Sequence, residues 1–538
     1  MTKSSPLRFL HLTAFLALVL TPTLLAELKL PAIIGDHMVL QQKQADPIWG
    51  WDNPGTKVTV SLAGKEYSAT AGGDGKWIVK LDPMSANATP QVLTISGSSK
   101  KDIQDVLIGE VWLCSGQSNM QFPLCPQGGF GGDWSGDLVA AASNLPNLRL
   151  ITVPNYGTQQ LQTDFKGQWT ASTPETAAKF SAVGFLFGRT LLQILNIPVG
   201  LIDDAWGGSA AEAWIRRSAL EQDPRFKKLM DMTVKQEAEC VTEKAKQDYD
   251  QAMVKWKVVA DKAKSEGHTP PRPPQSPESW MAGNHRPGNI FNGVLYPTIG
   301  YGIKGAIWYQ GESNSGQAYE YSYLFPFMIE QWRKEWGQGD FPFYWVQLAN
   351  FQVQQPQPAE SNWAELREAQ TKTLKLPNTG QAVIIDLGEG KDIHPRNKHD
   401  VAARLVRWPL VKDYGMKLPF RSPEFQSLSV TGNKATVTID CFGSKLRPFG
   451  VNEAIGFALC GEDKVWHWAQ GKIVGKDQNQ VEVTSAEVPA PIAVRYAWAN
   501  NPVCNLYSMD GLPLTPFRSD DFPMVTDPKH AVQPAAKP

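Results

Sequence analysis

This chain of 538 residues has few cysteines, almost no excess charge of either sign and few long apolar runs. Each of these shortages excludes a class of protein. With 52 Lys and Arg against 53 Asp and Glu, the net charge is -1, so there is no basic excess to attract nucleic acid. The 45 Gly and 40 Pro are too few for a fibrous or low-complexity chain. After residue 26, no run is apolar enough to cross a membrane. What remains is a globular chain, long enough for several domains.

The few cysteines bear on metal binding and on disulfides. The six lie at positions 114, 125, 240, 441, 460 and 504, without a Cys-x-x-Cys spacing or a His/Cys cluster typical of zinc sites. We therefore predict no metal and no cofactor. If the chain is exported, disulfides are permitted. The expected pairs are Cys114–Cys125 and one bridge among Cys441, Cys460 and Cys504.

The first 26 residues have the pattern of a secretory signal peptide. Lys3 and Arg8 precede an uncharged apolar run over 9–26, and polar sequence follows it. The same run is just long enough to be an uncleaved membrane anchor. We expect cleavage after residue 26 and a secreted or periplasmic protein that has no further contact with a membrane.

Periodicity and turn residues divide the rest of the chain. Residues 27–104 alternate apolar and polar positions between Gly- and Asn-rich turns, which predicts a small β domain. Residues 105–415 alternate apolar strands with helical patterns, which predicts a parallel sheet covered on both faces. A Lys/Glu/Ala-rich helical insertion and a Pro-rich linker interrupt this pattern over 222–290. Short strands return over 416–524, and we expect 525–538 to be disordered.

The first candidate site residue is Ser118, in the sequence GQSNM after the apolar strand 108–114. Loops beyond the carboxyl ends of parallel strands build the site in open sheets. A serine at the start of a helix has backbone N–H groups nearby that can stabilise an oxyanion. Position alone favours an ordinary N-cap, however. The sequence also differs from G-x-S-x-G, because Met120 replaces the last glycine.

The second candidate is the pair Asp392 and His394, which follows the apolar strand 381–387. A serine nucleophile needs a general base, usually His, and that His needs an acid to orient it. Residues two apart in an extended loop point to the same side. The alternative is a solvated loop. His399 and Asp400 are further candidates, although we expect them on the helix that follows.

Two more turns follow apolar strands. Gly207 and Gly208 allow a backbone N–H to approach an oxyanion closely. The side-chain amide of Gln310 or Asn314 is a second kind of donor. Each turn alone is typical of an ordinary βα connection. Four such turns at one sheet edge, carrying Ser, Gly-Gly, an amide and Asp/His, favour a single site.

Taken together, these blocks resemble those of a known family. The segments are GEVWLCSGQSNMQFPL, VGLIDDAWGGSAAEAWI, AIWYQGESN and KDIHPRNKHDVAARL, and they are similar to the four blocks of the sialate O-acetylesterases, a branch of the SGNH-type serine hydrolases. The resemblance extends over about residues 36–523, apart from the insertion. It implies a three-layer α/β/α domain flanked by β domains, and an esterase that removes O-acetyl groups from sugars.

The resemblance also implies roles for residues. Ser118 would be the nucleophile, His394 the base and Asp392 its partner. Many SGNH enzymes place the acid three residues before the His, where this chain has Lys391, so Asp386 and Glu389 stay open as alternatives. The residues implied to bind the oxyanion or the substrate are Gly207, Gly208, Gln310, Gln117, Asn119 and Asn314. Independently of the resemblance, the negative charge of Glu312 would repel an oxyanion, so we expect Glu312 to hold its loop through backbone hydrogen bonds rather than touch substrate.

Other functions stay open at this point. A Gly-rich loop over 127–136 with Trp134 would suit an esterase that acts on an open plant or algal polysaccharide. With 19 Trp residues, the chain could instead be a non-catalytic carbohydrate-binding protein. The insertion carries none of the four blocks, so we expect it to modulate access without supplying catalytic groups.

Overall fold

The computed structural model describes residues 1, 27–126, 130–131 and 145–529. The expected signal peptide, Trp134 with most of its Gly-rich loop, and the end of the tail lie outside these described residues. Among the described helices, none is long and apolar enough to span a bilayer.

The centre of the molecule is a mostly parallel sheet. Its strands are β7 (Lys100–Gly116), β8 (Leu148–Thr152), β9 (Thr170–Ala171), β10 (Val199–Asp203), β11 (Gly305–Tyr309), β12 (Phe343–Val346) and β13 (Thr379–Ala382). Their order is β13-β12-β11-β7-β10-β8-β9, and only β9 runs antiparallel to its neighbour. The predicted parallel sheet is therefore confirmed, with β7 at its centre.

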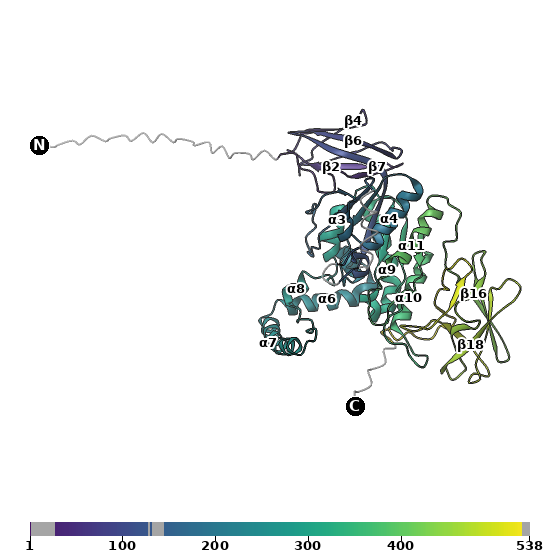
Figure 1. Ribbon diagram of the computed structural model, residues 1–538. Helices are drawn as coiled ribbons and strands as arrows, with labels where there is room; N and C mark the ends of the chain where they lie inside the picture. Colours follow the sequence, from purple (N-terminus) through teal and green to yellow (C-terminus); the bar gives the residue numbers. More distant parts are fainter. Residues whose placement is uncertain (2–26, 127–129, 132–144, 530–538) are drawn as a thin grey trace.

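Helices cover both faces of this sheet, as Figure 1 shows. On β7, Trp112 and Cys114 pack into the cluster formed with α4 (Ala182–Leu195) and α11 (Lys398–Lys412). Val111 and Leu113 point to the opposite face, which is covered by α9 (Ala318–Trp336) and α10 (Asn362–Lys372). Because every residue of this part of β7 is buried on one face or the other, this part of the strand is mostly apolar. This is the predicted three-layer arrangement.

The N-terminal β region shares a strand with this core. Its strands are β1 (Val39–Gln41), β2 (Pro47–Trp51), β3 (Lys57–Leu62), β4 (Lys65–Thr70), β5 (Lys76–Lys80) and β6 (Asn87–Ser96). β6 and β1 pair with the first half of β7, whose second half lies in the central sheet. The boundary predicted after residue 104 therefore falls inside one continuous strand.

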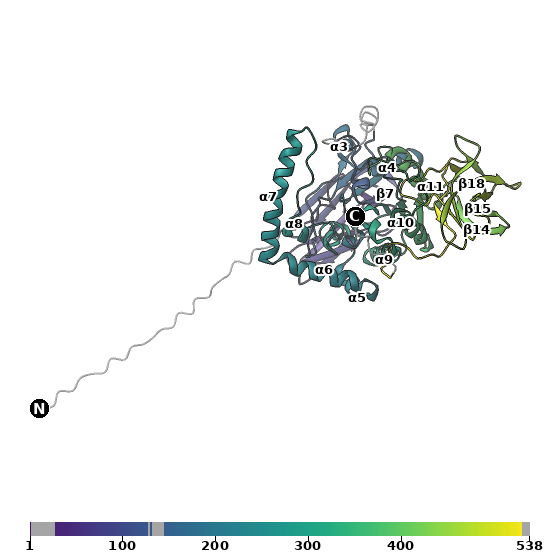
Figure 2. The same ribbon diagram turned by 90° about the horizontal axis from the view of Figure 1, so that it is seen from below.

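The insertion over 222–290 contains α6 (Lys227–Cys240), α7 (Glu243–Ser265) and α8 (Pro277–Met281). It lies on one side of the core, and the C-terminal β region lies on the other, as Figure 2 shows. Phe226 and Met230 of the insertion are buried in the core cluster, and Arg217 of the core donates a hydrogen bond to Glu237 of α6.

The C-terminal region is an antiparallel sheet in the order β14-β15-β19-β18-β17-β20-β22. These strands are β14 (Glu424–Thr431), β15 (Lys434–Asp440), β17 (Ala454–Cys460), β18 (Trp466–Val474), β19 (Gln480–Thr484), β20 (Ala493–Tyr496) and β22 (Phe517–Arg518), beside the pair β16 (Leu446–Pro448) and β21 (Leu506–Ser508). Arg518 joins the sheet to α10 through Glu368, at 2.9 Å.

Two expectations are wrong. Cys114, Cys441, Cys460 and Cys504 are free thiols, so neither Cys114–Cys125 nor a bridge among the C-terminal cysteines forms. The tail is also held further than predicted, because the backbone N–H groups of Val525 and Thr526 donate to the buried Glu365 carboxylate at 2.7 and 3.1 Å.

Candidate active site

Ser118 lies where β7 ends at the carboxyl edge of the sheet. Gly116 has φ 138°, a conformation that favours glycine, and a Cβ there would collide with the Tyr309 carbonyl of β11. Gln117 is the N-cap of the short helix α1 (Ser118–Gln121) and makes no side-chain capping bond. Ser118 is therefore not the N-cap, which removes the structural alternative for this serine. As the first residue of α1, it has a backbone N–H without an intrahelical acceptor.

His394 reaches Ser118 from the loop between β13 and α11. Its Nε2 lies 2.9 Å from the Ser118 Oγ, although 276 residues separate the two in sequence. The ring lies near two phenylalanines, with Phe122 stacked at 6.4 Å and Phe130 edge-on at 5.1 Å between centroids. These aromatic contacts restrict the imidazole to a position that faces the serine.

Asp392 is the acid beside this histidine. Its Oδ1 lies 3.4 Å from His394 Nδ1 and also accepts the His394 backbone N–H at 2.9 Å. The side chain of Asp392 is 45% exposed, so water screens this pair. The two alternative acids have other partners. Asp386 accepts two hydrogen bonds from Arg404, at 2.6 and 2.8 Å. Glu389 accepts a hydrogen bond from the Arg396 backbone N–H. The pair His399 and Asp400 lies on α11, as expected.

The surroundings of His394 favour its neutral form. Burial lowers the pKa of the imidazole below 6.5, and the nearby positive charge of Lys398 lowers it further. Asp392 acts in the opposite direction, and the exposed Arg272 of the insertion adds a smaller lowering effect. A histidine that is neutral at neutral pH is able to accept a proton from a serine hydroxyl.

The Gly207–Gly208 turn lies against Ser118. A Cβ at Gly207 would be 3.4 Å from the Ser118 Cβ, which is ordinary contact, but only 2.9 Å from Gln121 Oε1, so a larger residue would displace that side chain. Asn284 donates to the Gly207 carbonyl at 2.6 Å, and Ser313 donates to the Gly208 carbonyl at 3.0 Å. Both carbonyls of the turn are thus held by hydrogen bonds from other segments.

Gln121 was not predicted from the sequence. The Gly207 N–H donates to its Oε1 at 2.8 Å, so this side chain occupies one of the expected oxyanion donors. The available signal was its spacing, since Gln121 is three residues after Ser118 and shares its face of α1.

The structure contradicts the expected donor role of Gln310. Both N–H groups of its amide already have acceptors, the Ser209 carbonyl at 3.1 Å and Asn314 Oδ1 at 2.7 Å, and the side chain is fully buried. Asn314 is buried as well and donates to Glu212 at 2.9 Å. These amides form a polar network beneath the site, so neither is placed to contact an oxyanion.

Gln117 and Asn119 also face inward, contrary to the expectation that they bind substrate. Gln117 Oε1 accepts the N–H groups of Gly311 and Ser313, both at 3.3 Å, which joins the serine turn to the loop after β11. The amide of Asn119 donates to Glu312 at 2.6 Å. Glu312 is half-buried, and its side chain accepts this hydrogen bond from Asn119, whereas backbone groups were expected to hold it.

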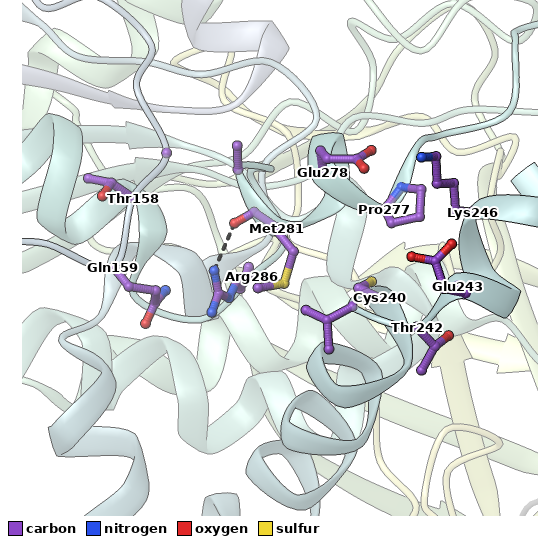
Figure 3. Close-up of a pocket in the computed structure, with 13 residues that line it drawn as sticks. Thr158, Gln159, Cys240, Thr242, Glu243, Lys246, Pro277, Glu278, Met281 and Arg286 are labelled. Carbon is purple, nitrogen blue, oxygen red and sulfur yellow. Dashed lines mark hydrogen bonds between the residues drawn. The ribbon is translucent and has the colours of Figure 1, made fainter.

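A pocket of about 500 Å³ lies between the insertion and the segment Gly157–Gln159 (Figure 3). Arg286 lines it and donates to the Met281 carbonyl, as the dashed line in Figure 3 marks. Asn284, which holds Gly207, belongs to the same segment of chain. The insertion therefore contacts the site through the residues that support the glycine turn.

Comparison with known proteins shows that the chain is similar to carbohydrate esterases. Residues 278–403, which include His394, match the family model described as carbohydrate esterase, sialic acid-specific acetylesterase. The chain is 28% identical over 530 residues to the sialate O-acetylesterase of Mus musculus, covering 90% of this chain and 93% of the relative. For the sialate O-acetylesterase of Homo sapiens, the identity is 27% over 534 residues, covering 90% and 91%.

A solved structure covers nearly the whole chain. It is the crystal structure of a carbohydrate acetylesterase from Xanthomonas citri, with 36% identity and a TM-score of 0.76. The alignment covers 92% of this chain and 100% of that one, so it includes both β regions and the central domain.

Proposed function

The chain belongs to the sialate O-acetylesterase family of carbohydrate esterases, and on that premise we propose that it hydrolyses O-acetyl esters of sugars through an acetyl-enzyme on Ser118. The observation that carries the mechanism is the 2.9 Å contact between Ser118 Oγ and His394 Nε2. A serine hydroxyl is a weak nucleophile, and a base at hydrogen-bond distance activates it.

In the first half of the reaction, Ser118 Oγ attacks the acetyl carbonyl while His394 Nε2 accepts its proton. The Ser118 N–H and the Gly207–Gly208 turn supply the donors for the oxyanion. The Gly207 N–H is bonded to Gln121 Oε1 in this structure, so the Gln121 side chain must move aside for that N–H to serve. His394 then returns the proton to the departing sugar hydroxyl, which leaves the acetyl group on Ser118.

In the second half, water replaces the sugar. His394 accepts a proton from the water as it attacks the acetyl-enzyme, and returns it to Ser118 when acetate departs. Asp392 beside Nδ1 selects the tautomer in which Nε2 is free to accept a proton, and it stabilises the charged imidazole. Because Asp392 is half-exposed and 3.4 Å away, this help is smaller than that of a buried aspartate.

The substrate class follows from the relatives. Those in mouse and human are named for acetylated sialic acid, and the Xanthomonas protein for carbohydrate. We propose an O-acetylated sugar, and sialate esters are the first candidates. An acetylated polysaccharide is the alternative. We also propose that the chain is exported, because residues 1–26 have the pattern of a signal peptide.

Acetate release from a panel of acetylated sialic acids and polysaccharides tests this function. Ser118→Ala should fold normally and lose kcat by about 10⁴-fold or more, as expected when a triad nucleophile is removed. Ser265→Ala, a change at an exposed serine of α7, is the matched control and should keep full activity. Undiminished acetate release by Ser118→Ala would refute the mechanism. Binding without hydrolysis by the unmodified protein would instead favour a carbohydrate-binding protein.

A further inference from the structure

We propose that Lys398 is a positioning residue for this reaction: its buried ammonium fixes the Asn119 amide, and that amide holds the Ser118 helix against the His394 loop. The inference rests on the proposed Ser118–His394 chemistry. Lys398 is the first residue of α11 and lies four residues after His394 in sequence. Lys398 belongs to the fourth sequence block, but the sequence pattern predicts no role for it.

The burial of Lys398 is the first observation. Its side chain is 0% exposed, a state that lysine almost never adopts without a partner. The Nζ donates to Asn119 Oδ1 at 2.6 Å and lies over the Phe122 and Tyr309 rings, at 4.4 and 5.4 Å from their centroids. An ammonium removed from water costs several kcal/mol unless contacts of this kind offset it. A methionine of similar length would fill the same space without that cost.

The second observation is where the Asn119 amide points. Its Nδ2 donates to Glu312 Oε1 at 2.6 Å and to the Ile393 carbonyl at 3.1 Å. A lysine ammonium only donates, and a carboxylate only accepts, so the amide satisfies both partners in one orientation alone. Lys398 thereby determines that the N–H side of Asn119 faces Ile393.

This orientation joins the two halves of the catalytic pair. Asn119 directly follows Ser118, and Ile393 directly precedes His394. The 3.1 Å bond between them therefore connects the neighbours of two residues that are 276 positions apart and must stay at 2.9 Å. A displacement of about 1 Å between reacting groups costs on the order of 10²-fold in rate. Loosening this bond should act on kcat rather than on substrate binding.

The charge of Lys398 predicts a second measurable effect, on the pH dependence of activity. Groups that face Lys398 are the carboxylates of Glu312, Asp392 and Glu389, and the imidazole of His394. Burial lowers the pKa of Lys398 to about 7, and the three carboxylates act against this shift. Toward His394 the ammonium acts together with the exposed Arg272 and against Asp392. Removing the amine should therefore raise the pKa of His394 and move the acid limb of activity to higher pH.

The test compares Lys398→Met with the unmodified chain on a small aryl acetate. We expect kcat to fall by about 10²-fold with KM nearly unchanged. The acid limb of kcat/KM should move upward in pH. Lys398→Gln retains a donor but no charge, so it should recover part of kcat while keeping the shifted acid limb. A purely structural lysine would lower the melting temperature and leave the kcat and pH profile of the folded protein unchanged, which would overturn the proposal.

A double-mutant comparison separates the positioning role from general damage. If Lys398 acts through Asn119, then Lys398→Met combined with Asn119→Ala should lose no more kcat than Asn119→Ala alone. Additive losses would contradict the proposal. If Lys398→Met does not fold, Asn119→Ala decides by itself, because wild-type kcat in that variant would show that the amide positions nothing. An active Ser118→Ala enzyme would refute the proposed function instead, so the two failures are distinguishable.

Discussion

Asp392→Asn tests how strongly the acid and the base are coupled. Asp392 Oδ1 and His394 Nδ1 are 3.4 Å apart, and the aspartate side chain is 45% exposed. For unit charges at this separation, the interaction is about 1.2 kcal/mol in water and about 2.4 kcal/mol at half the dielectric constant of water. At 1.36 kcal/mol for each factor of ten, kcat should fall about 10- to 100-fold. This is far below the loss of about 10⁴-fold that follows when a buried triad aspartate is replaced.

The assay is steady-state hydrolysis of an aryl acetate, with kcat and KM measured separately. Asp400→Asn is the matched control, because Asp400 lies 3.4 Å from His399 and is 50% exposed. This control should keep wild-type kcat. A loss near 10⁴-fold in Asp392→Asn would show that the pair is less screened than its exposure indicates. Wild-type kcat in Asp392→Asn together with a large loss in Glu389→Gln would show that the partner is wrong.

Three further predictions follow from the same contacts. Burial and Lys398 lower the pKa of His394 below 6.5, so kcat/KM should rise with pH through an apparent pKa under 6.5. A kcat/KM profile with an apparent pKa above 6.5 would contradict this prediction. Because Gln310 bonds within the buried network, Gln310→Ala should lower the free energy of unfolding by about 1–3 kcal/mol, measured by denaturant titration. A selective kcat loss at unchanged stability would restore its oxyanion role. Replacing α7 (243–265) with a short linker should keep aryl acetate hydrolysis, whereas Asn284→Ala should lower kcat because it releases the Gly207 carbonyl.

The fold was largely predictable because its strands carry simple patterns. The half-buried strand β3 alternates exposed and buried residues, and the central part of β7 is apolar because helices cover both of its sides. What the patterns did not reveal is that β7 continues from one sheet into the next. The pattern changes from partly exposed to fully buried in the middle of β7 while the strand itself continues, so a boundary predicted from the pattern falls inside the strand.

The proximity of Ser118 and His394 also followed from topology, because parallel strands bring their carboxyl ends to one edge. The oxyanion donors did not follow. Residue type shows that Gln310 carries an amide, but not that both of its N–H groups already have acceptors. Residue type does not reveal the burial of Lys398 either, because lysine in the first turn of a helix is usually solvated.

Disulfide pairing was wrong for a physical reason as well. Cys114 is on β7 and points into the core beneath α4, where a Cβ at Gly184 would lie 2.9 Å from its Sγ. Spacing in sequence carries no information about this direction, and Cys125 lies beyond the end of α1.

Trapping the acetyl-enzyme tests the central claim most directly. The protein is mixed with an aryl acetate, quenched in acid during turnover and digested, and the peptide that contains Ser118 is analysed by mass spectrometry. We predict an acetyl group on Ser118 in the unmodified chain and none in Ser118→Ala, which should release no acetate. An acetyl group on a different residue, or acetate release by Ser118→Ala at the wild-type rate, would contradict it.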